Sequence, residues 1–278
     1  MAGPLAAAQN LPPPGTEIDT SHFDGFENWP LYRPGELRAE NDAIADQRIL
    51  YKAQFPSAAG LQGPLEDTIM MMDLHDLYFR GEPALWVQWT STGRRDDPAG
   101  TASIDMLIAD KASHRLLYRI QSVGGPGGPP VWAPPLSIQS HMRSKIIDVN
   151  VTSDGETETK TLESDDAGTI DFATLQFWLP FIGLEEGMKF RVPYYQRQRE
   201  QIGGLPVQVV GRAEIVDANG DKHDVWRVQT MSDTRASLIE FWISEDAPYF
   251  MGWDFRLTRD GRRVAYMEYM KHWLLPRD

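Results

Sequence analysis

The sequence contains no cysteine, and this absence excludes several kinds of chemistry at once. Disulfide bonds, thiolate metal sites and cysteine nucleophiles all require a residue that the chain does not have. The sequence also lacks an apolar run long enough to cross a bilayer as a helix, so it predicts no transmembrane segment. Positive charge is in deficit as well. The formal net charge is −13, which argues against nucleic acid as a partner, because phosphate groups bind basic surfaces.

The signature motifs of common enzyme classes are missing too. The chain has no G-x-S-x-G nucleophile turn, no phosphate-binding loop and no dinucleotide fingerprint. Its six histidines show neither H-x-H nor H-E-x-x-H spacing, so we expect no zinc site. Residues 217–221 resemble a calcium loop, but no bidentate glutamate follows at the required distance, and a tight turn is the better interpretation. We therefore expect no metal and no cofactor.

What the sequence does contain is a C-terminal stretch with strong β-strand character. Three antiparallel strands are predicted, over Leu238–Ser244, Tyr249–Thr258 and Arg262–Trp273. The second and third are separated by Asp260-Gly261, a pair that suits a two-residue turn with positive φ. The sequence therefore predicts a closing hairpin whose register can be read from its turn.

This turn determines which side chains share a face of the sheet. If Asp260 and Gly261 are the two loop residues, Trp253 lies opposite Glu268. Because side chains alternate along a strand, one apolar face then turns inward and carries polar groups among its aromatic rings. The residues of this expected face are Tyr249, Met251, Trp253, Phe255, Leu257, Val264, Tyr266, Glu268, Met270 and His272. Either Glu268 is a satisfied buried group, or the face lines a ligand pocket.

The contribution of the preceding strand depends on the length of its connection to the hairpin. A three-residue connection places Ile239, Phe241 and Ile243 inward. A connection one residue longer places Glu240 and Trp242 there instead, because a slip of one residue exchanges the two faces. The first arrangement makes the better core.

A second hairpin is predicted upstream, between Pro206–Val216 and Lys222–Met231, with an Asn-Gly pair in the turn. Its register places Arg212 opposite Arg227. Like charges directly opposite each other on a sheet repel, so an anionic partner is needed. Glu214 on the same face is one candidate, and a bound carboxylate or phosphate is the other.

The best candidate for a helix is Asp171–Leu179, because Asp171 can cap its start and Pro180 marks its end. A short helix this apolar is typical of a plug under a sheet. Further strands are expected over 67–79, 84–90, 102–109, 114–121, 144–152, 157–163 and 188–195. The predicted fold class is all-β: a strongly curved antiparallel sheet or open barrel of about ten strands, wrapped around one short helix.

The N-terminal part is less regular. Residues 1–35 are rich in proline and are predicted to form an extended arm, whose aromatic residues favour wrapping of the domain over disorder. Residues 36–278 are expected to form a single antiparallel β half-barrel domain that begins with a weakly helical stretch, Glu36–Gln47. Gly124–Pro130 is the strongest break, and we interpret it as a lid or binding loop, or alternatively as a domain boundary.

Near the start, Ala6-Ala7-Ala8-Gln9 is similar to what is left around a small-residue cleavage site. The charged and apolar regions of a signal peptide are missing from the sequence as given. We therefore expect an exported protein of the periplasm whose signal peptide precedes this sequence.

The segment 165–273 resembles a family of exported bacterial proteins of unknown function. The similarity rests on DFATLQFWLPFIGLEEGMKFRVPYY, on GRAEIVDANGDKHDVWRVQT, and on the closing FWISEDAPYFMGWDF and DGRRVAYMEY. It also rests on a corner formed by Trp242, Ser244, Asp246 and Pro248. The resemblance implies a curved half-barrel around a helix, similar to periplasmic carriers that hold acyl chains, and it implies no catalytic residues.

Three functions fit these observations. The first is a periplasmic binding or carrier protein for an apolar or amphipathic small molecule held in an aromatic-lined cavity. Its candidate ligand-binding residues are Trp253, Tyr249, Tyr266, Glu268, His272, Trp242, Arg212 and Arg227. The second is a lyase or hydrolase with acid–base candidates Glu268, His272, Asp73 and His75. The third is a structural protein of envelope assembly, which an exposed apolar patch would favour.

Overall fold

The structure, a computed structural model, describes residues 14–32, 46–56, 65–91, 103–123, 136–143, 146–153, 156–163, 172–196, 201–232 and 235–275. Within these ranges no helix has both the length and the apolar character needed to cross a membrane. The predicted Gly124–Pro130 loop, Asp171 and nearly all of Glu36–Gln47 lie outside the described residues.

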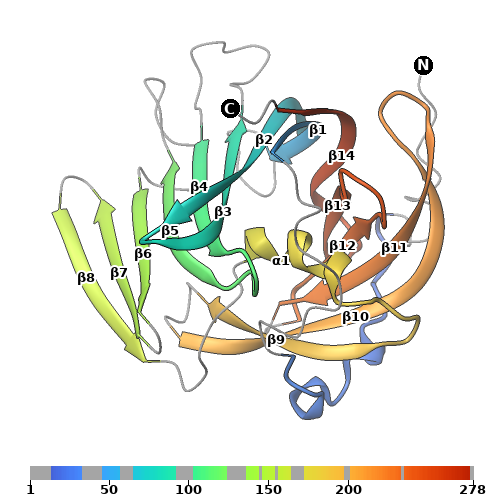
Figure 1. Cartoon of the computed structure of the whole chain (residues 1–278). Coiled ribbons are helices and arrows are strands. Elements are labelled where there is room, and N and C mark those ends of the chain that lie inside the picture. The colour runs from blue at the N-terminus through green and yellow to red at the C-terminus, as the bar shows by residue number, and fades with distance from the viewer. Residues whose placement is uncertain are drawn as a thin grey trace.

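One antiparallel sheet of 14 strands makes up most of the described chain (Figure 1). The strands are β1 (Gln47–Pro56), β2 (Leu65–Phe79), β3 (Glu82–Ser91), β4 (Ser103–Asp110), β5 (Leu116–Val123), β6 (Leu136–Arg143), β7 (Ile146–Ser153), β8 (Glu156–Glu163), β9 (Lys189–Gln196), β10 (Gln201–Val216), β11 (Lys222–Met231), β12 (Ser237–Ile243), β13 (Phe250–Leu257) and β14 (Arg263–Leu274).

The strand order is almost purely sequential. Each strand pairs with its neighbour in sequence, except that β1 pairs with β14 and so joins the first and last strands. The two outermost strands, β8 and β9, are connected through helix α1 (Phe172–Trp178) and a 3₁₀ helix, Leu179–Phe181. Figure 1 shows the sheet curving around α1. The prediction of a curved antiparallel sheet around one short helix is therefore confirmed, with 14 strands in place of about ten.

The helix fills the concave side of the sheet, which we call the inner face. Leu175, Trp178 and Leu179 are fully buried there. The ring of Phe177 lies 6.3 Å from that of Phe250 on β13 and 6.4 Å from that of Trp89 on β3, so one helical residue joins distant strands. Burial of each such side chain is worth about 1.5–3 kcal/mol. The apolar helix that was predicted to plug the sheet therefore packs against the apolar residues of the inner face.

The first part of the described N-terminal arm lies on the opposite side, which we call the outer face, whereas Tyr32 at its end packs against Trp178 of the inner core. Ile18 and Phe23 are buried against Met231 and Leu238. The backbone N–H of Ile18 donates to the carbonyl of Thr258 at 2.7 Å. Further along, the arm reaches the edge strand β9 by a bridge from Leu31 to Arg191, so these residues follow the sheet and protect its edge.

The register of the last hairpin differs from the predicted one. The N–H of Leu257 bonds to the carbonyl of Arg262, so the loop consists of residues 258–261 and is longer than the expected two-residue turn. A bulge follows between Phe255 and Arg256, and Trp253 lies opposite Met267 instead of Glu268. A slip of one residue exchanges faces. Trp253 therefore packs with the inner core, whereas Tyr266 belongs to a separate cluster on the outer face, and the prediction that they share a face is wrong.

The same kind of slip affects the β10–β11 hairpin. Arg212 lies opposite Trp226, and Arg227 lies opposite Gly211, because the turn is longer than two residues: the N–H of Asp217 bonds to the carbonyl of Asp221. The predicted juxtaposition of the two arginines is therefore wrong. On β12 the prediction holds, since Phe241 and Ile243 are in the inner core and Ile239 packs against it.

Gly252 on β13 is the position where this register tolerates no side chain. Its φ is 134°, and a Cβ atom would lie 2.1 Å from the carbonyl oxygen of Met267 on β14. We predict that Gly252→Ala costs more than about 4 kcal/mol of unfolding free energy or prevents folding, as measured by urea denaturation.

Gly81 is the matched control, because its φ is also positive, at 89°, but nothing lies within 4 Å of its missing Cβ. Gly81→Ala should cost only the backbone strain of about 1–3 kcal/mol. Equal losses for the two variants would show that the close β13–β14 approach at Gly252 is wrong.

Candidate functional site

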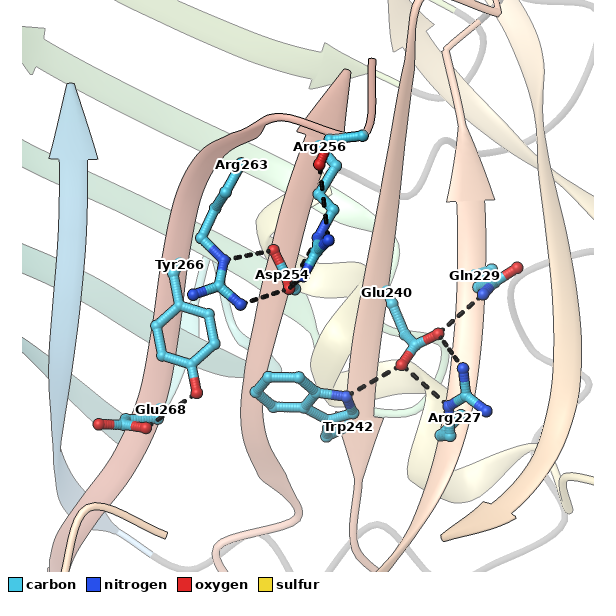
Figure 2. A network of polar contacts seen from close by, with 10 residues as sticks. Arg227, Gln229, Glu240, Trp242, Asp254, Arg256, Arg263, Tyr266 and Glu268 are labelled. Carbon is cyan, nitrogen blue, oxygen red and sulfur yellow. Dashed lines mark hydrogen bonds and ion pairs between the residues drawn. The ribbon is translucent and has the colours of Figure 1, made fainter. Parts of the chain in front are cut away.

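Polar side chains are concentrated on the outer face of β11–β14 (Figure 2). Gln229, Glu240, Asp254 and Tyr266 lie side by side on four successive strands. The adjacent row contains Arg227, Trp242, Gly252 and Glu268. Burial of charged groups is costly unless each is paired, so the contacts of each carboxylate determine its role.

Glu240 is fully enclosed and fully bonded. Its side chain has 0% exposure and accepts two hydrogen bonds from Arg227, at 2.9 and 2.7 Å. Gln229 and Trp242 donate two more, at 2.7 and 3.2 Å. A buried carboxylate with four donors is held in one position and has little capacity for chemistry.

Asp254 is satisfied in the same way by two arginines. Arg256 donates at 3.1 and 2.9 Å, and Arg263 donates at 3.0 and 2.8 Å. The guanidinium of Arg263 also lies 4.3 Å above the ring of Tyr266, a cation–π arrangement. Both carboxylates are thus structural parts of the outer face.

Glu268 differs from these two. It is 6% exposed, and among the described residues its one hydrogen bond comes from the Tyr266 hydroxyl, at 2.8 Å. The ammonium of Lys52 on β1 lies 3.8 Å from the other carboxylate oxygen, beyond hydrogen-bond distance. Burial raises the pKa of Glu268, and the Tyr266 hydrogen bond, Lys52 and Arg263 only partly oppose this effect. Burial, followed by the adjacent Glu268 charge, also raises the pKa of Tyr266.

The apolar surroundings of Glu268 come from a small second core. Trp242, Tyr266, Met251, Ile215 and Val225 form this cluster. The indole ring of Trp242 meets the Tyr266 ring edge-on, with centroids 5.7 Å apart. In Figure 2 the Trp242 ring extends across β13 toward Tyr266, over the strand that carries glycine at the paired position.

The tip of the β10–β11 hairpin, residues 217–221, contacts β14 beside this cluster. The N–H of Ala218 donates to the carbonyl of Tyr269 at 3.1 Å, and the Asn219 side chain donates to the carbonyl of Met270. Asp217 organises the tip by accepting from the backbone N–H groups of Asn219 and Asp221. The hairpin therefore reaches over the outer face and is attached to it at its end.

Histidines surround this attachment. His223 lies 3.0 Å from the Asp217 carboxylate, and Tyr269 lies 2.8 Å from His272 through its hydroxyl. Burial would raise the pKa of Asp217, but the hydrogen bonds from His223, Asp221 and Asn219 hold it below its ordinary value. Burial lowers the pKa of His272.

The other candidate acid–base pair is not brought together. Asp73 is held by Arg48 through two hydrogen bonds, at 2.6 and 2.8 Å. His75 instead stacks on Trp86, with ring centroids 4.9 Å apart. In the described part of the chain, no three histidine, aspartate or glutamate side chains gather closely enough to hold a metal ion.

The predicted ligand-binding residues are divided between several places. Trp253 and Tyr249 lie with the inner core, whereas Tyr266, Glu268 and Trp242 lie on the outer face. His272 pairs with Ile49 of β1 beyond a register shift and so is not aligned with Glu268 as expected. Arg212 stacks on Trp226 at 4.3 Å and pairs with Glu245, and Glu214 pairs with Lys222.

The sequence-based search missed Asp254, considered Asp217 only as part of a rejected calcium loop, and treated Glu240 only as part of an alternative register. The signal was present as alternation: Glu240 and Trp242 share one face of β12, and Asp254 and Arg256 share one face of β13. A strand that alternates apolar residues with paired acids and bases indicates a sheet covered on both faces.

We predict that Arg227→Ala lowers the free energy of unfolding by about 3–5 kcal/mol, because Glu240 would stay buried without its main partner. Arg212→Ala is the control on the neighbouring strand. Its ion pair with Glu245 is exposed, at 52% and 61% for the two side chains, so the loss should be below about 1 kcal/mol. Chemical denaturation measures both, and equal losses would contradict the assigned registers.

We predict that Glu268→Gln stabilises the protein at alkaline pH and has little effect in acid. Glutamine keeps an acceptor for Tyr266 but cannot ionise. Because burial raises the pKa of Glu268, the folded state binds more protons than the unfolded state between the ordinary pKa and the raised one, and wild-type stability falls as pH rises through that interval. Thermal unfolding at several pH values tests this, and a melting-temperature difference that is independent of pH would contradict it.

Comparison with known proteins adds a family and a fold. Residues 143–253 match the model of DUF3108, described as a protein of unknown function. No curated protein matches the chain. A similar solved structure is the crystal structure of a beta-barrel-like protein of domain of unknown function DUF1849 from Brucella abortus. It has a TM-score of 0.51 and 10% identity, over 84% of this chain and 99% of that chain.

At this identity, the likeness to the Brucella protein concerns the fold alone. The family match confirms the predicted resemblance to proteins of unknown function, whereas their export stays a prediction. Residues 143–253, which include Arg227, Glu240 and Trp242 of the outer face, thus match the DUF3108 model, and the fold of the chain is similar to that of a beta-barrel-like DUF1849 protein.

Proposed function

We propose that this protein binds an apolar or amphipathic small molecule at one end of the inner face, and that it acts as a carrier in the periplasm. The observation that supports this most is a group of half-buried apolar side chains continuous with the core. The group, which we call the apolar end, consists of Phe55, Ile239 and Trp253.

The registers place these residues together. Trp253 lies between Phe241 and Met267 on its neighbouring strands, and Met267 lies opposite Ala53 on β1. Phe55 is the next inner residue along β1, and its ring meets that of Trp253 edge-on at 6.2 Å. These residues lie where β1 ends and β14 begins.

The helix leaves this end partly uncovered. Its residue Phe177 packs on Phe250 and Trp89, and Phe181 packs on Tyr249 at the opposite end of β13, 5.3 Å away. Phe177, Phe181 and Phe250 are buried, whereas the side chains of the apolar end are only partly buried, as Tyr249 is. Exposed apolar surface beside a packed core is typical of small-molecule sites.

The proposal differs from the sequence-based one in its residues. Trp253 is kept as a ligand contact, and Phe55 and Ile239 join it. Tyr266 and Glu268 are left out because they lie on the outer face. The periplasmic location rests on the sequence features near the N-terminus.

Binding of the neutral fluorescent probe N-phenyl-1-naphthylamine tests the proposal. We predict saturable binding that Trp253→Ala weakens about tenfold or more, since loss of a large ring contact of about 1.5–3 kcal/mol changes Kd by that factor. Native mass spectrometry of protein purified from its host should also show a retained small molecule.

The matched control is Trp273→Ala, which removes an exposed tryptophan near the far end of β14. This variant should bind the probe as the wild type does. The proposal fails if the wild type shows no saturable binding, or if both variants, each shown to be folded by its unfolding curve, bind equally well.

A further inference from the structure

The hairpin tip at residues 217–221 is attached to β14 by few contacts. Two hydrogen bonds, from Ala218 and Asn219, join it to carbonyl oxygens of β14. The ring of His223 meets that of Tyr269 edge-on, with centroids 5.9 Å apart. Such an attachment at the end of a long hairpin is weaker than a continuous strand pairing, and it can open without unfolding the sheet.

Among the described outer-face carboxylates of β12, β13 and β14, the tip lies beside the one with the fewest hydrogen-bond donors. Glu240 and Asp254 each accept four hydrogen bonds, whereas Glu268 accepts one, from Tyr266. The hairpin supplies Ile215 and Val225 to the apolar cluster next to Glu268, and it brings the Asp217 carboxylate toward it. The hairpin next to the Glu268 carboxylate therefore carries a second negative charge, that of Asp217.

We propose that the hairpin tip is a pH-sensitive latch, closed on β14 when Glu268 is protonated and loosened when Glu268 ionises. Ionised Glu268 is poorly solvated in the closed form and repels Asp217. Opening the tip admits water to the carboxylate and moves Asp217 away. This device is separate from the ligand site on the inner face.

The charged and titratable groups around Glu268 determine the direction of the response. Tyr266 and Arg263 from β14 and Lys52 from β1 favour the ionised form, and Asp217 from the hairpin opposes it. The neighbouring position on β13 is Gly252, which contributes no side chain. The net result, with burial as the largest cause, is a raised pKa of Glu268 in the closed form.

The sign follows from proton linkage. The closed form holds its Glu268 proton to higher pH than an open form in which water reaches the carboxylate, so acid favours closing. His272, whose ring contacts the Tyr269 hydroxyl, acts in the opposite direction. Burial lowers the pKa of His272, so a proton on its ring disfavours the closed form.

The absence of native cysteine allows a direct test. Spin labels at Asp224→Cys on β11 and Lys271→Cys on β14, both exposed positions, report the distance from the hairpin to the strand by double electron–electron resonance. Between about pH 5 and pH 8 a longer-distance population should grow, about tenfold in the open-to-closed ratio for each unit by which closing raises the pKa of Glu268.

Glu268→Gln in the same labelled protein should stay closed over the whole range. Glu214→Gln, which removes an exposed carboxylate from the same hairpin, should respond as the parent does. Thermal unfolding establishes that each variant is folded. A distance distribution that does not change with pH in the parent, or one that changes equally in Glu268→Gln, would overturn the latch.

Discussion

The pairing register of β12, β13 and β14 determines which face carries the candidate ligand site and which carries the buried carboxylates. Side chains alternate along a strand, so the opposition of Trp253 to Met267 sends Trp253 toward the helix and Tyr266 and Glu268 away from it. This register also has a steric requirement for glycine, because the backbone of Gly252 approaches Met267 too closely for a Cβ atom. A slip of one residue would place Glu240, Asp254 and Glu268 against the apolar helix.

Both faces of these strands are consequently covered, and they are covered by different means. On the inner face, α1 and the rings around Phe250 form an apolar core. On the outer face, the arm covers one end through Ile18 and Phe23, and the β10–β11 hairpin covers the other. Between them lie carboxylates that must each find donors, because a buried unpaired charge is costly. Glu240 and Asp254 do so fully, whereas Glu268 accepts one hydrogen bond among the described residues, and the latch proposed for the hairpin rests on this difference.

Much of the fold could be predicted from the sequence. The three closing strands, the apolar helix ending near Pro180 and the all-antiparallel order follow from periodicity and turn residues. Strand β1 was missed although Ile49, Tyr51 and Ala53 alternate with polar residues, because the acidic stretch before it looked weakly helical. The registers could not be predicted, since they depend on turns longer than two residues in both hairpins and on a bulge near Phe255, which leave no mark in the hydrophobic pattern. The candidate site inherited this error: Glu268 was identified, but with the wrong neighbours.

The account depends most directly on the face assignment of Trp253 and Tyr266, and backbone contacts between β13 and β14 measured by nuclear Overhauser effects in solution test it. The assigned register predicts cross-strand contacts between Trp253 and Met267 and between Asp254 and Tyr266. Contacts between Trp253 and Glu268 and between Phe255 and Tyr266 would instead return both rings to one face. That result would contradict the separation of the ligand site from the buried carboxylates.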